Sequence, residues 1–373
     1  MSFSLPDFPW DSLAEDGALA AAHPGGIVDL SVGTPVDPVP DVVRAALAGP
    51  AAGIPGYPTT HGPESLRAAV GGSLARRFGV TVDPAAVLPT IGSKELVAWL
   101  PTLLGFGAGD TVVIPELAYP TYEVGARLAG ATAIRSDSTT ALGPRRVALV
   151  WLNSPSNPTG RVLPAEHLRK VVDWARERGT VVASDECYLS LSGRASADAR
   201  SGEPPRGALS VLHPDVCGGS HEGLLAVHSM SKSSNLAGYR AGFVTGDPRL
   251  VAALLEVRKH AGMIVPRPVQ AAMQAAASDD AHVTAQAQVY ARRRARLRPA
   301  LEAAGMRIDH SEAGLYLWAT ADEPARATVR RLATAGVLVA PGDFYGPAGA
   351  RHVRVALTAG DERIAAAAER LKG

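Results

Sequence analysis

Cysteine, aromatic residues and excess charge are all scarce in this chain of 373 residues. Two cysteines, Cys187 and Cys217, are too few for a disulfide framework or a cysteine metal cluster and fit a reducing compartment. Lysine plus arginine total 37 and aspartate plus glutamate 36, so the net charge of +1 offers no basic field for nucleic-acid phosphates. No apolar run approaches the ~20 residues of a membrane-spanning helix, and the first residues do not resemble a signal peptide. We therefore expect a cytoplasmic protein without membrane or nucleic-acid partners.

The rest of the composition is typical of a globular enzyme. Apolar residues make up 46% and charged residues 20%, which is enough to bury a large core. A chain of this length suits two domains of ~100–200 residues each. We expect an N-terminal arm over 1–12, a large domain over 48–275, and a small domain formed by 13–47 and 276–373.

Short β-branched segments alternate with helical segments from Pro63 onward. Strands are expected at 87–91, 111–114, 146–152, 180–183, 224–228 and 241–245. Helices are expected at 63–78, 93–104, 119–129 and 164–178. This alternation predicts an α/β fold with a doubly wound, mostly parallel sheet. After a long helix over 281–304, short strands and a last helix over 361–371 predict a smaller α+β domain.

Ligands of such sheets bind beyond the carboxyl ends of the strands. Gly92-Ser93-Lys94 follows one expected strand and opens a helix, where free N–H groups can hold a phosphate. Polar residues follow the other strands: Asn157, Asp185, Tyr188, Ser229, Ser231 and Lys232. A lysine, an acid and a phosphate-binding turn at one edge suggest pyridoxal 5′-phosphate (PLP), whose usual partners are a lysine and a carboxylate.

Three motifs then make the resemblance specific. They are Asn157-Pro-Thr-Gly160, Asp185-Glu-Cys-Tyr188 and Ser229-Met-Ser-Lys232-Ser-Ser-Asn-Leu-Ala-Gly-Tyr-Arg240. In this order they resemble the motifs of class I aminotransferases, which are PLP enzymes of fold type I. The resemblance runs from Gly33-Thr-Pro to Arg354-Val-Ala-Leu and implies a homodimer with shared active sites.

The resemblance assigns a role to each cofactor-binding residue. Lys232 would bind the PLP aldehyde covalently and carry the proton during catalysis. Asp185 would pair with the pyridine nitrogen, and Asn157 and Tyr188 would bind the phenolate oxygen. Tyr119 would stack on the ring. The phosphate would be held by Ser93, Lys94, Ser229, Ser231, Arg240 and, from the neighbouring subunit, Tyr57.

The resemblance also names substrate-binding residues. Arg354 would hold the substrate α-carboxylate, with Asn157 beside it, and Gly33 would allow close approach of the backbone. On periodicity alone, Arg354 between Val353 and Val355 would face solvent, whereas the resemblance implies that it is buried. His228 and Cys187 are expected to be packed residues without a chemical role.

Three further segments resemble those of actinobacterial N-succinyldiaminopimelate aminotransferases. They are Leu5-Pro-Asp-Phe-Pro-Trp10-Asp-Ser-Leu, Val28-Asp-Leu-Ser-Val-Gly-Thr-Pro-Val-Asp-Pro38 and Ala340-Pro-Gly-Asp-Phe-Tyr-Gly346. This resemblance implies amino transfer from glutamate to N-succinyl-2-amino-6-oxopimelate in lysine and diaminopimelate synthesis. The outer pocket must then hold a second anionic group, and the sequence does not choose among its candidates, Lys94, Arg161, Asn235 and Arg267.

Other functions remain open at this level. Enzymes of similar sequence include aspartate, aromatic and N-acetyl-diaminopimelate aminotransferases, C–S lyases and cyclopropane-forming synthases, and a fold does not fix a reaction. A regulatory protein that binds PLP without turnover is a second class, but Lys232, Asp185 and Arg354 are all present. A dinucleotide oxidoreductase is disfavoured because no G-x-G-x-x-G follows an early strand.

Overall fold

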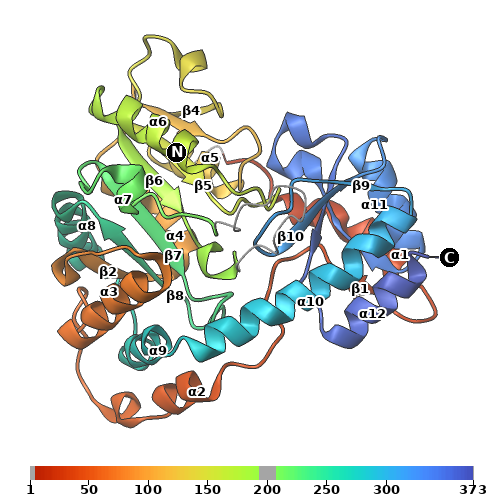
Figure 1. Cartoon of the computed structure of the whole chain (residues 1–373), viewed down its shortest axis with the longest axis horizontal. Coiled ribbons are helices and arrows are strands. Elements are labelled where there is room, and N and C mark those ends of the chain that lie inside the picture. The colour runs from red at the N-terminus through yellow and green to blue at the C-terminus, as the bar shows by residue number, and fades with distance from the viewer. Residues whose placement is uncertain (1–4, 193–206, 373) are drawn as a thin grey trace.

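A seven-stranded sheet forms the centre of the larger part of the protein (Figure 1). The computed structural model describes residues 5–192 and 207–372. The strand order is β2 (Val87–Ile91), β8 (Ala241–Gly246), β7 (Leu224–Ser229), β6 (Val181–Asp185), β5 (Leu149–Asn153), β3 (Thr111–Ile114) and β4 (Thr132–Arg135). Strand β8 runs antiparallel to both of its neighbours, and the other pairs are parallel. The expected doubly wound, mostly parallel sheet is confirmed.

Helices cover both faces of this sheet, which is why its strands are almost continuously apolar. One face packs against α3 (Glu64–Phe78), α6 (Ala165–Arg176), α7 (Pro214–Cys217) and α9 (Arg267–Ser278). The other face packs against α4 (Gly92–Leu103), α5 (Thr121–Leu128) and α8 (Pro248–Ala261). Alternate residues of one strand enter opposite cores: Val150 and Leu152 pack on the first face, and Leu149 and Trp151 on the second.

A smaller antiparallel sheet lies beside the large one. Its order is β12 (Ala340–Pro341), β13 (Val353–Ala356), β10 (Tyr316–Thr320) and β9 (Arg307–Asp309). The two-residue strands β1 (Val28–Asp29) and β11 (Val337–Leu338) pair in parallel nearby. A third core joins these strands to Leu13, which follows the arm, and to α1 (Ala14–Ala21), α11 (Ala325–Thr334) and α12 (Asp361–Arg370).

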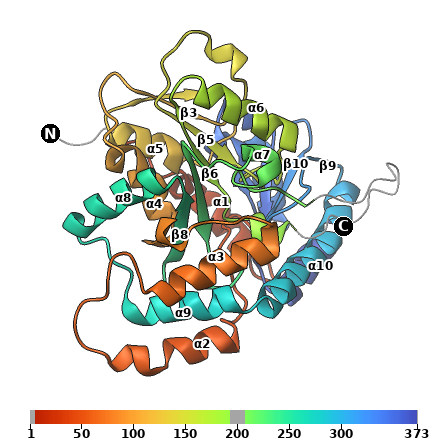
Figure 2. The same cartoon turned by 60° about the vertical axis from the view of Figure 1, so that its left-hand side comes forward.

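Helix α10 (Ala281–Ala303) joins the two sheets in space. It starts near α9 and extends to the smaller sheet (Figure 1). Helix α9 lies between α3 and α2 (Asp41–Leu47), as Figure 2 shows from a second side. The chain therefore crosses between its two parts along α10 and along the segment between β1 and α2.

Several local expectations need correction. The strand expected at 27–32 is present only as β1, which is two residues long, and the next residue, Leu30, packs in the core of the smaller sheet, where it bonds to the backbone of Leu338 and Ala356. Pro63 is the residue before α3 rather than its first residue. Strand β4 and helices α8 and α9 are present without having been expected. A 3₁₀ turn spans Pro9–Leu13 at the end of the arm, where Trp10 packs on Phe344 and donates to the Ser31 carbonyl.

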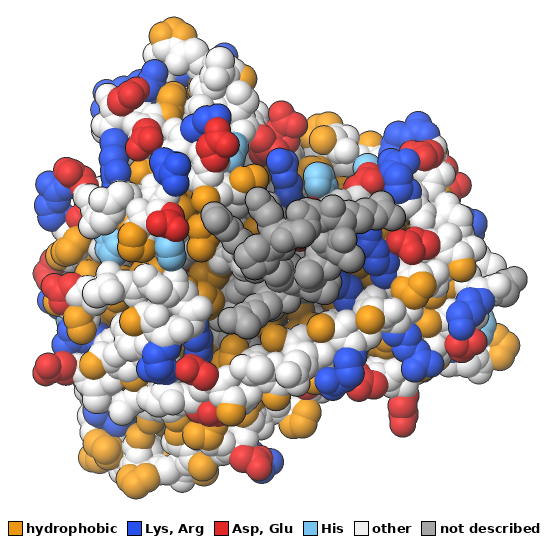
Figure 3. Space-filling model, in the orientation of Figure 1, with side chains coloured by type: hydrophobic (Ala, Val, Ile, Leu, Met, Phe, Trp, Pro, Cys, Tyr) orange, Lys and Arg blue, Asp and Glu red, His pale blue; other side chains and the backbone are white. Residues whose placement is uncertain are grey.

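The surface shows no dominant charge. Among the described residues on the face in Figure 3, acidic and basic side chains are interspersed. No helix in the described part of the chain has the length and hydropathy required to cross a bilayer.

Candidate active site

A cavity of about 420 Å³ lies at the carboxyl ends of the central strands, facing the smaller sheet. All but one of the cofactor- and substrate-binding residues that the family resemblance names line it: Gly33, Ser93, Lys94, Tyr119, Asn157, Asp185, Tyr188, Ser229, Ser231, Lys232, Arg240 and Arg354. Tyr57 is the exception. Its side chain is 94% exposed on the loop before α3, away from the cavity.

Asp185 ends strand β6 as a buried carboxylate held by three donors. The Tyr122 hydroxyl donates to Oδ2 at 2.8 Å, and the Cys187 backbone N–H (3.2 Å) and thiol (2.7 Å) donate to Oδ1. Burial raises the pKa of Asp185, and the bonds from Cys187 and Tyr122 partly oppose that rise. A protonated ring nitrogen would supply the cationic partner that favours the ionised carboxylate.

Lys232 lies in the turn after β7 with its amine in the cavity. Burial lowers the pKa of this amine to about 8, and the charges of Arg240 and Arg354 lower it further against an opposing effect of Cys187. Among the described residues, no carboxylate is one of the groups that shift the pKa of this amine. An amine in this state is partly neutral near pH 8, as a nucleophile toward an aldehyde must be.

A phosphate-sized anion site lies where α4 begins. Gly92 has φ +71°, and a Cβ there would overlap the Arg240 guanidinium. A Cβ on Gly242 would lie 3.0 Å from the Ser93 backbone nitrogen. The two glycines thus bring a helix N-terminus and an arginine together, a combination that binds phosphate. Ser229 and Ser231 line the same side of the cavity.

Asn157 connects the cofactor side of the cavity to the substrate side. The Asn153 side chain accepts from the Asn157 backbone N–H at 2.7 Å, which fixes the loop. The Asn157 side-chain oxygen accepts from Arg354 Nη1 at 2.9 Å. The Tyr188 hydroxyl lies 3.0 Å from the Tyr316 hydroxyl. The side chains of Asn157 and Tyr188 are therefore held in place by other residues of the protein before a ligand binds.

Arg354 is 2% exposed, so the solvent-facing orientation that periodicity alone favours is wrong. Its guanidinium carbon lies 4.1 Å from the ring centre of Tyr316 and 5.1 Å from that of Tyr345. Its side-chain donors reach only neutral oxygens, and its Nε has no partner among the described residues. A Cβ on Gly33 would collide with the Tyr316 hydroxyl. A buried cation without an acid, beside a bare backbone, is suited to bind a carboxylate.

The sequence did not identify several cavity residues. Phe8 and Trp10 of the arm form one wall, and Tyr316 and Cys187 line the floor. Tyr122 could have been considered, because it stands three residues after Tyr119, although helix α5 begins only at Thr121 and the two tyrosines do not share a helical face. Nothing in the sequence predicts that Tyr316 lines the cavity, because it lies on β10 of the smaller sheet.

The four outer-pocket candidates separate clearly in the structure. Lys94 lines the cavity, and its amine lies 5.7 Å from the centre of the Phe8 ring. Burial and the charge of Arg240 lower the pKa of Lys94. Arg161 lines a separate cavity, Arg267 donates to the Tyr57 carbonyl, and Asn235 is bonded to other residues.

His228 and Glu186 form a buried pair behind the site. His228 stacks on Phe243 with ring centres 4.8 Å apart, and burial lowers its pKa to about 3. Burial raises the pKa of Glu186 to about 7, against bonds from neighbouring donors. Both groups are thus neutral at slightly acid pH, and His228 is a packed residue, as expected.

These features define a PLP-dependent aminotransferase of fold type I. Within the described ranges, the donor set fits the cofactor: the Lys232 amine has no acid partner, the Asp185 carboxylate has no cation, and a Cβ would fill the cradle at Gly92. The family model "Aminotransferase class I and II" matches residues 26–371. The chain belongs to this family and uses pyridoxal phosphate.

Individual relatives agree in class and differ in their named substrates. The chain is 64% identical to a probable aminotransferase of Mycobacterium tuberculosis, over 100% of this chain and 86% of that one. It is 58% identical to the 4-dedimethylamino-4-oxo-anhydrotetracycline transaminase of Streptomyces rimosus, over 98% and 99%. A solved structure titled a probable N-succinyldiaminopimelate aminotransferase of Thermus thermophilus has a TM-score of 0.85 at 28% identity, covering 98% and 99%.

Proposed function

We propose that the protein transfers an amino group from glutamate to N-succinyl-2-amino-6-oxopimelate, which yields N-succinyl-L,L-diaminopimelate for lysine and diaminopimelate synthesis. The observation that carries this proposal is that the cavity holds two cations, Arg354 and Lys94, besides Lys232 and Arg240. Arg354 is buried and has no acid partner among the described residues, whereas Lys94 is exposed and its amine lies 5.7 Å from the centre of the Phe8 ring. Glutamate and the acylated substrate each carry an α-carboxylate and a more distant anionic group. A flexible lysine can reach distal anions at different distances.

The residues divide the chemical work among themselves. Bound PLP supplies an electron-withdrawing ring that stabilises negative charge at the substrate Cα. Asp185 would hold the ring nitrogen in its protonated form, and Asn157 and Tyr188 would bind the phenolate oxygen. Lys232 would hold the cofactor's aldehyde and would carry the proton taken from the substrate Cα.

Arg354 orients the substrate for that proton transfer. Arg354 is already bonded to Asn157 and to the Ser31 carbonyl, so its side chain loses little conformational entropy when the carboxylate binds. Trp10 and Phe8 of the arm reduce access of water from the side of the small sheet.

The matching relatives support both this proposal and one alternative. The Thermus structure carries the proposed activity in its title, at 28% identity. The Streptomyces relative, at 58% identity, is named for a tetracyclic ketone. The aromatic wall of Phe8 and Trp10 would suit such a flat substrate. Lys94 distinguishes these two candidate substrates. The distal carboxylate of the diaminopimelate substrate needs a cation, whereas a tetracyclic ketone would bind through contacts with its rings.

Absorbance spectroscopy of the PLP-loaded protein tests the proposal. N-succinyl-L,L-diaminopimelate is added without a keto acid, and conversion of the cofactor to its pyridoxamine form is recorded. Conversion supports the proposal. No conversion, with glutamate still converting the cofactor, would leave the aminotransferase class and reject the diaminopimelate substrate. The variant Lys94→Met should raise KM for this substrate at least about tenfold, whereas alanine, which lacks a distal anion, serves as the control substrate.

We further propose the assembly and location. The protein acts as a cytoplasmic homodimer in which Tyr57 of each subunit reaches the phosphate of the other, which accounts for a tyrosine that is 94% exposed. Residues 48–275 form the large domain, and 13–47 with 276–373 form the small one.

A further inference from the structure

The turn that carries Lys232 is held from outside the cavity by one face of α10. Ser234 and Asn235 follow the lysine, and both are buried. Ser234 Oγ lies 2.8 Å from His282 Nε2, and Asn235 Nδ2 donates to Gln286 Oε1 at 2.9 Å. His282 and Gln286 are four residues apart, so they share a helical face. Successive turns of α10 thus hold successive residues of the lysine turn.

His282 is itself fixed through its other ring nitrogen. Nδ1 lies 2.9 Å from Asp279 Oδ2, so the carboxylate places the proton on Nδ1 and leaves Nε2 to accept from Ser234. Burial lowers the pKa of His282, against the effect of Asp279, which keeps the ring neutral at pH 7. Acid, imidazole and hydroxyl in series resemble a nucleophilic triad. However, Ser234 is 2% exposed and lines neither described cavity, so no substrate reaches it.

Gln286 extends the chain of bonds to the substrate side. Its amide donates to Asp37 Oδ2 at 2.9 Å, and Arg293 donates to the same oxygen at 2.8 Å. Asn235 also donates to the Pro38 carbonyl at 3.1 Å. Asp37 is four residues after Gly33, which lines the cavity, as does Lys232. The same face of α10 therefore bonds to the segments that follow two cavity residues, Lys232 and Gly33.

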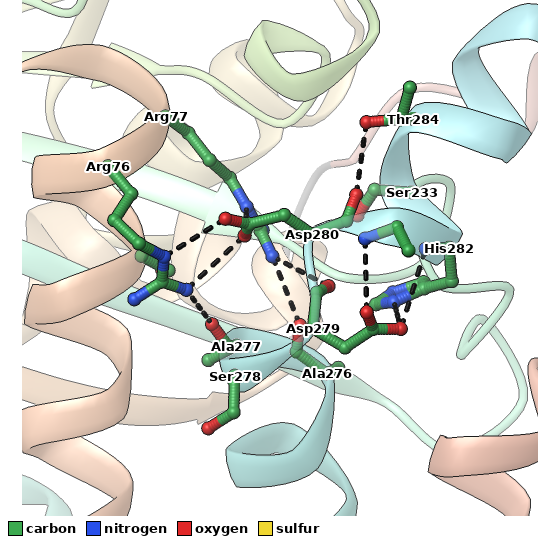
Figure 4. A network of polar contacts seen from close by, with 12 residues as sticks. Arg76, Arg77, Ser233, Ala276, Ala277, Ser278, Asp279, Asp280, His282 and Thr284 are labelled. Carbon is green, nitrogen blue, oxygen red and sulfur yellow. Dashed lines mark hydrogen bonds and ion pairs between the residues drawn. The ribbon is translucent and has the colours of Figure 1, made fainter.

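The first turn of α10 is anchored to α3 by ion pairs. Figure 4 shows Arg76 and Arg77 reaching from α3 to Asp280, with Asp279 and His282 beside them. The Arg77–Asp280 nitrogen–oxygen distance is 2.6 Å and the Arg76–Asp280 distance is 2.9 Å. The face that holds the lysine turn thus has a fixed reference in the large-sheet layer.

We propose that His282 and Gln286 are positioning residues for the transamination. They fix Lys232 relative to the Gly33 segment, so that the amine and the carboxylate-binding wall meet the same substrate. The proposal rests on the assignment of Lys232 as the PLP lysine and not on the identity of the acceptor substrate.

A substrate-free signal follows from the electrostatics of Lys232. The amine's pKa of about 8 comes first from burial and then from Arg240 and Arg354, with Cys187 opposing them. When the turn loosens, water reaches the amine and its pKa rises toward 10.5. The pH at which the apo-protein captures PLP at half its maximal rate should then rise as well.

The experiment measures PLP capture by absorbance across pH in matched variants. Gln286→Met removes the amide with little change of shape. His282→Asn keeps a polar group near Asp279 and loses the partner of Ser234, whereas His282→Gln places an acceptor near the lost Nε2. We expect the midpoint to rise by about half a unit or more in Gln286→Met and His282→Asn, and to stay near that of the wild type in His282→Gln. With glutamate, kcat/KM should fall about tenfold in the first two variants.

Arg76→Ala is the structural control. It breaks the Arg76–Asp280 pair, which anchors the same helix but does not touch the lysine turn. It should lower the thermal unfolding midpoint and leave the pH midpoint of PLP capture unchanged. The proposal is overturned if Gln286→Met and His282→Asn leave the pH midpoint within about 0.1 unit of the wild type, or if Arg76→Ala shifts it equally. Neither result depends on the acceptor, so a failed diaminopimelate assignment is recognised separately.

Discussion

Single residues in this site are defined by the partners that they lack. Lys232, Asp185 and Arg354 are buried ionisable groups, and none has an opposite charge beside it in the described structure. A buried unpaired charge is costly, so its retention indicates that a ligand supplies the partner. The family motifs include all three residues, because each stands in a short sequence pattern, and all three line one cavity. Their roles stay predictions.

Replacing the lysine tests the assignment most directly. Lys232→Ala removes the only amine in the lysine turn, so turnover should fall at least about a thousandfold while the fold persists. Activity is measured with glutamate and 2-oxoglutarate, and folding by circular dichroism. Retained transamination would exclude Lys232 as the PLP lysine.

Tyr122 should contribute through Asp185. Tyr122→Phe removes the hydroxyl that donates to Asp185 Oδ2 but keeps the stacking on Trp151, whose ring centre is 4.9 Å away. The loss of one bond to a charged group, about 1.5–3 kcal/mol, should raise the pKa of Asp185 and weaken PLP binding at least about tenfold. Fluorescence titration with PLP measures this, and Tyr239→Phe, at an exposed position, should leave the affinity unchanged.

Glu186 predicts a pH dependence of stability. Its pKa is raised from 4.5 to about 7 in the folded state, so the folded state holds a proton that the unfolded state has lost. The contribution of Glu186 to the free energy of unfolding is therefore fully present below pH 4.5 and is lost as the pH rises to about 7. Glu186→Gln should remove this dependence, on the order of 3 kcal/mol across the window. Urea unfolding at pH 5 and pH 7.5 measures the free energy of unfolding of both proteins. The same pH dependence in the wild type and in Glu186→Gln would contradict the interpretation of Glu186 as a buried acid.

At the scale of elements, the sequence was most informative where neighbours along the chain also lie together in space. Strands β2 and β3 match the expected bounds, because short β-branched runs bounded by turns have few alternatives. The antiparallel direction of β8 and the edge strand β4 depend on distant pairing, which periodicity does not encode. Tyr316 was not predicted as a cavity residue for the same reason: its position depends on how the smaller sheet packs beside the larger one.

The start of α4 allows an element-scale prediction. Gly92→Ala places a Cβ at φ +71°, against the Arg240 guanidinium. The strain should displace Arg240 from the helix N-terminus and weaken PLP binding by an order of magnitude or more, with smaller loss for pyridoxal, which lacks the phosphate. Equal losses for both ligands would argue against a phosphate site here. Gly105→Ala, also at positive φ but with open space around it, controls for backbone strain.

At the scale of the whole molecule, the proposed dimer explains why one expected residue lies apart from the others. Tyr57 extends from the loop before α3, and no contact within the described subunit brings it to the cavity. Sequence resemblance could assign it a role, but the geometry of one subunit cannot.

Mixed dimers test the shared site. Subunits with Lys232→Ala are mixed with subunits carrying Tyr57→Ala, and activity is followed over time. If Tyr57 acts across the interface, each mixed dimer contains one intact site, and activity should rise well above that of either parent. Activity equal to the average of the parents would place Tyr57 outside the partner's site.

The arm has a consequence for how related enzymes could diverge. Phe8 and Trp10 form a wall of the substrate cavity, yet they lie at the start of the chain and outside both sheets. Substitutions at these two positions could therefore alter which substrates enter the cavity, while the catalytic lysine and its supports stay untouched.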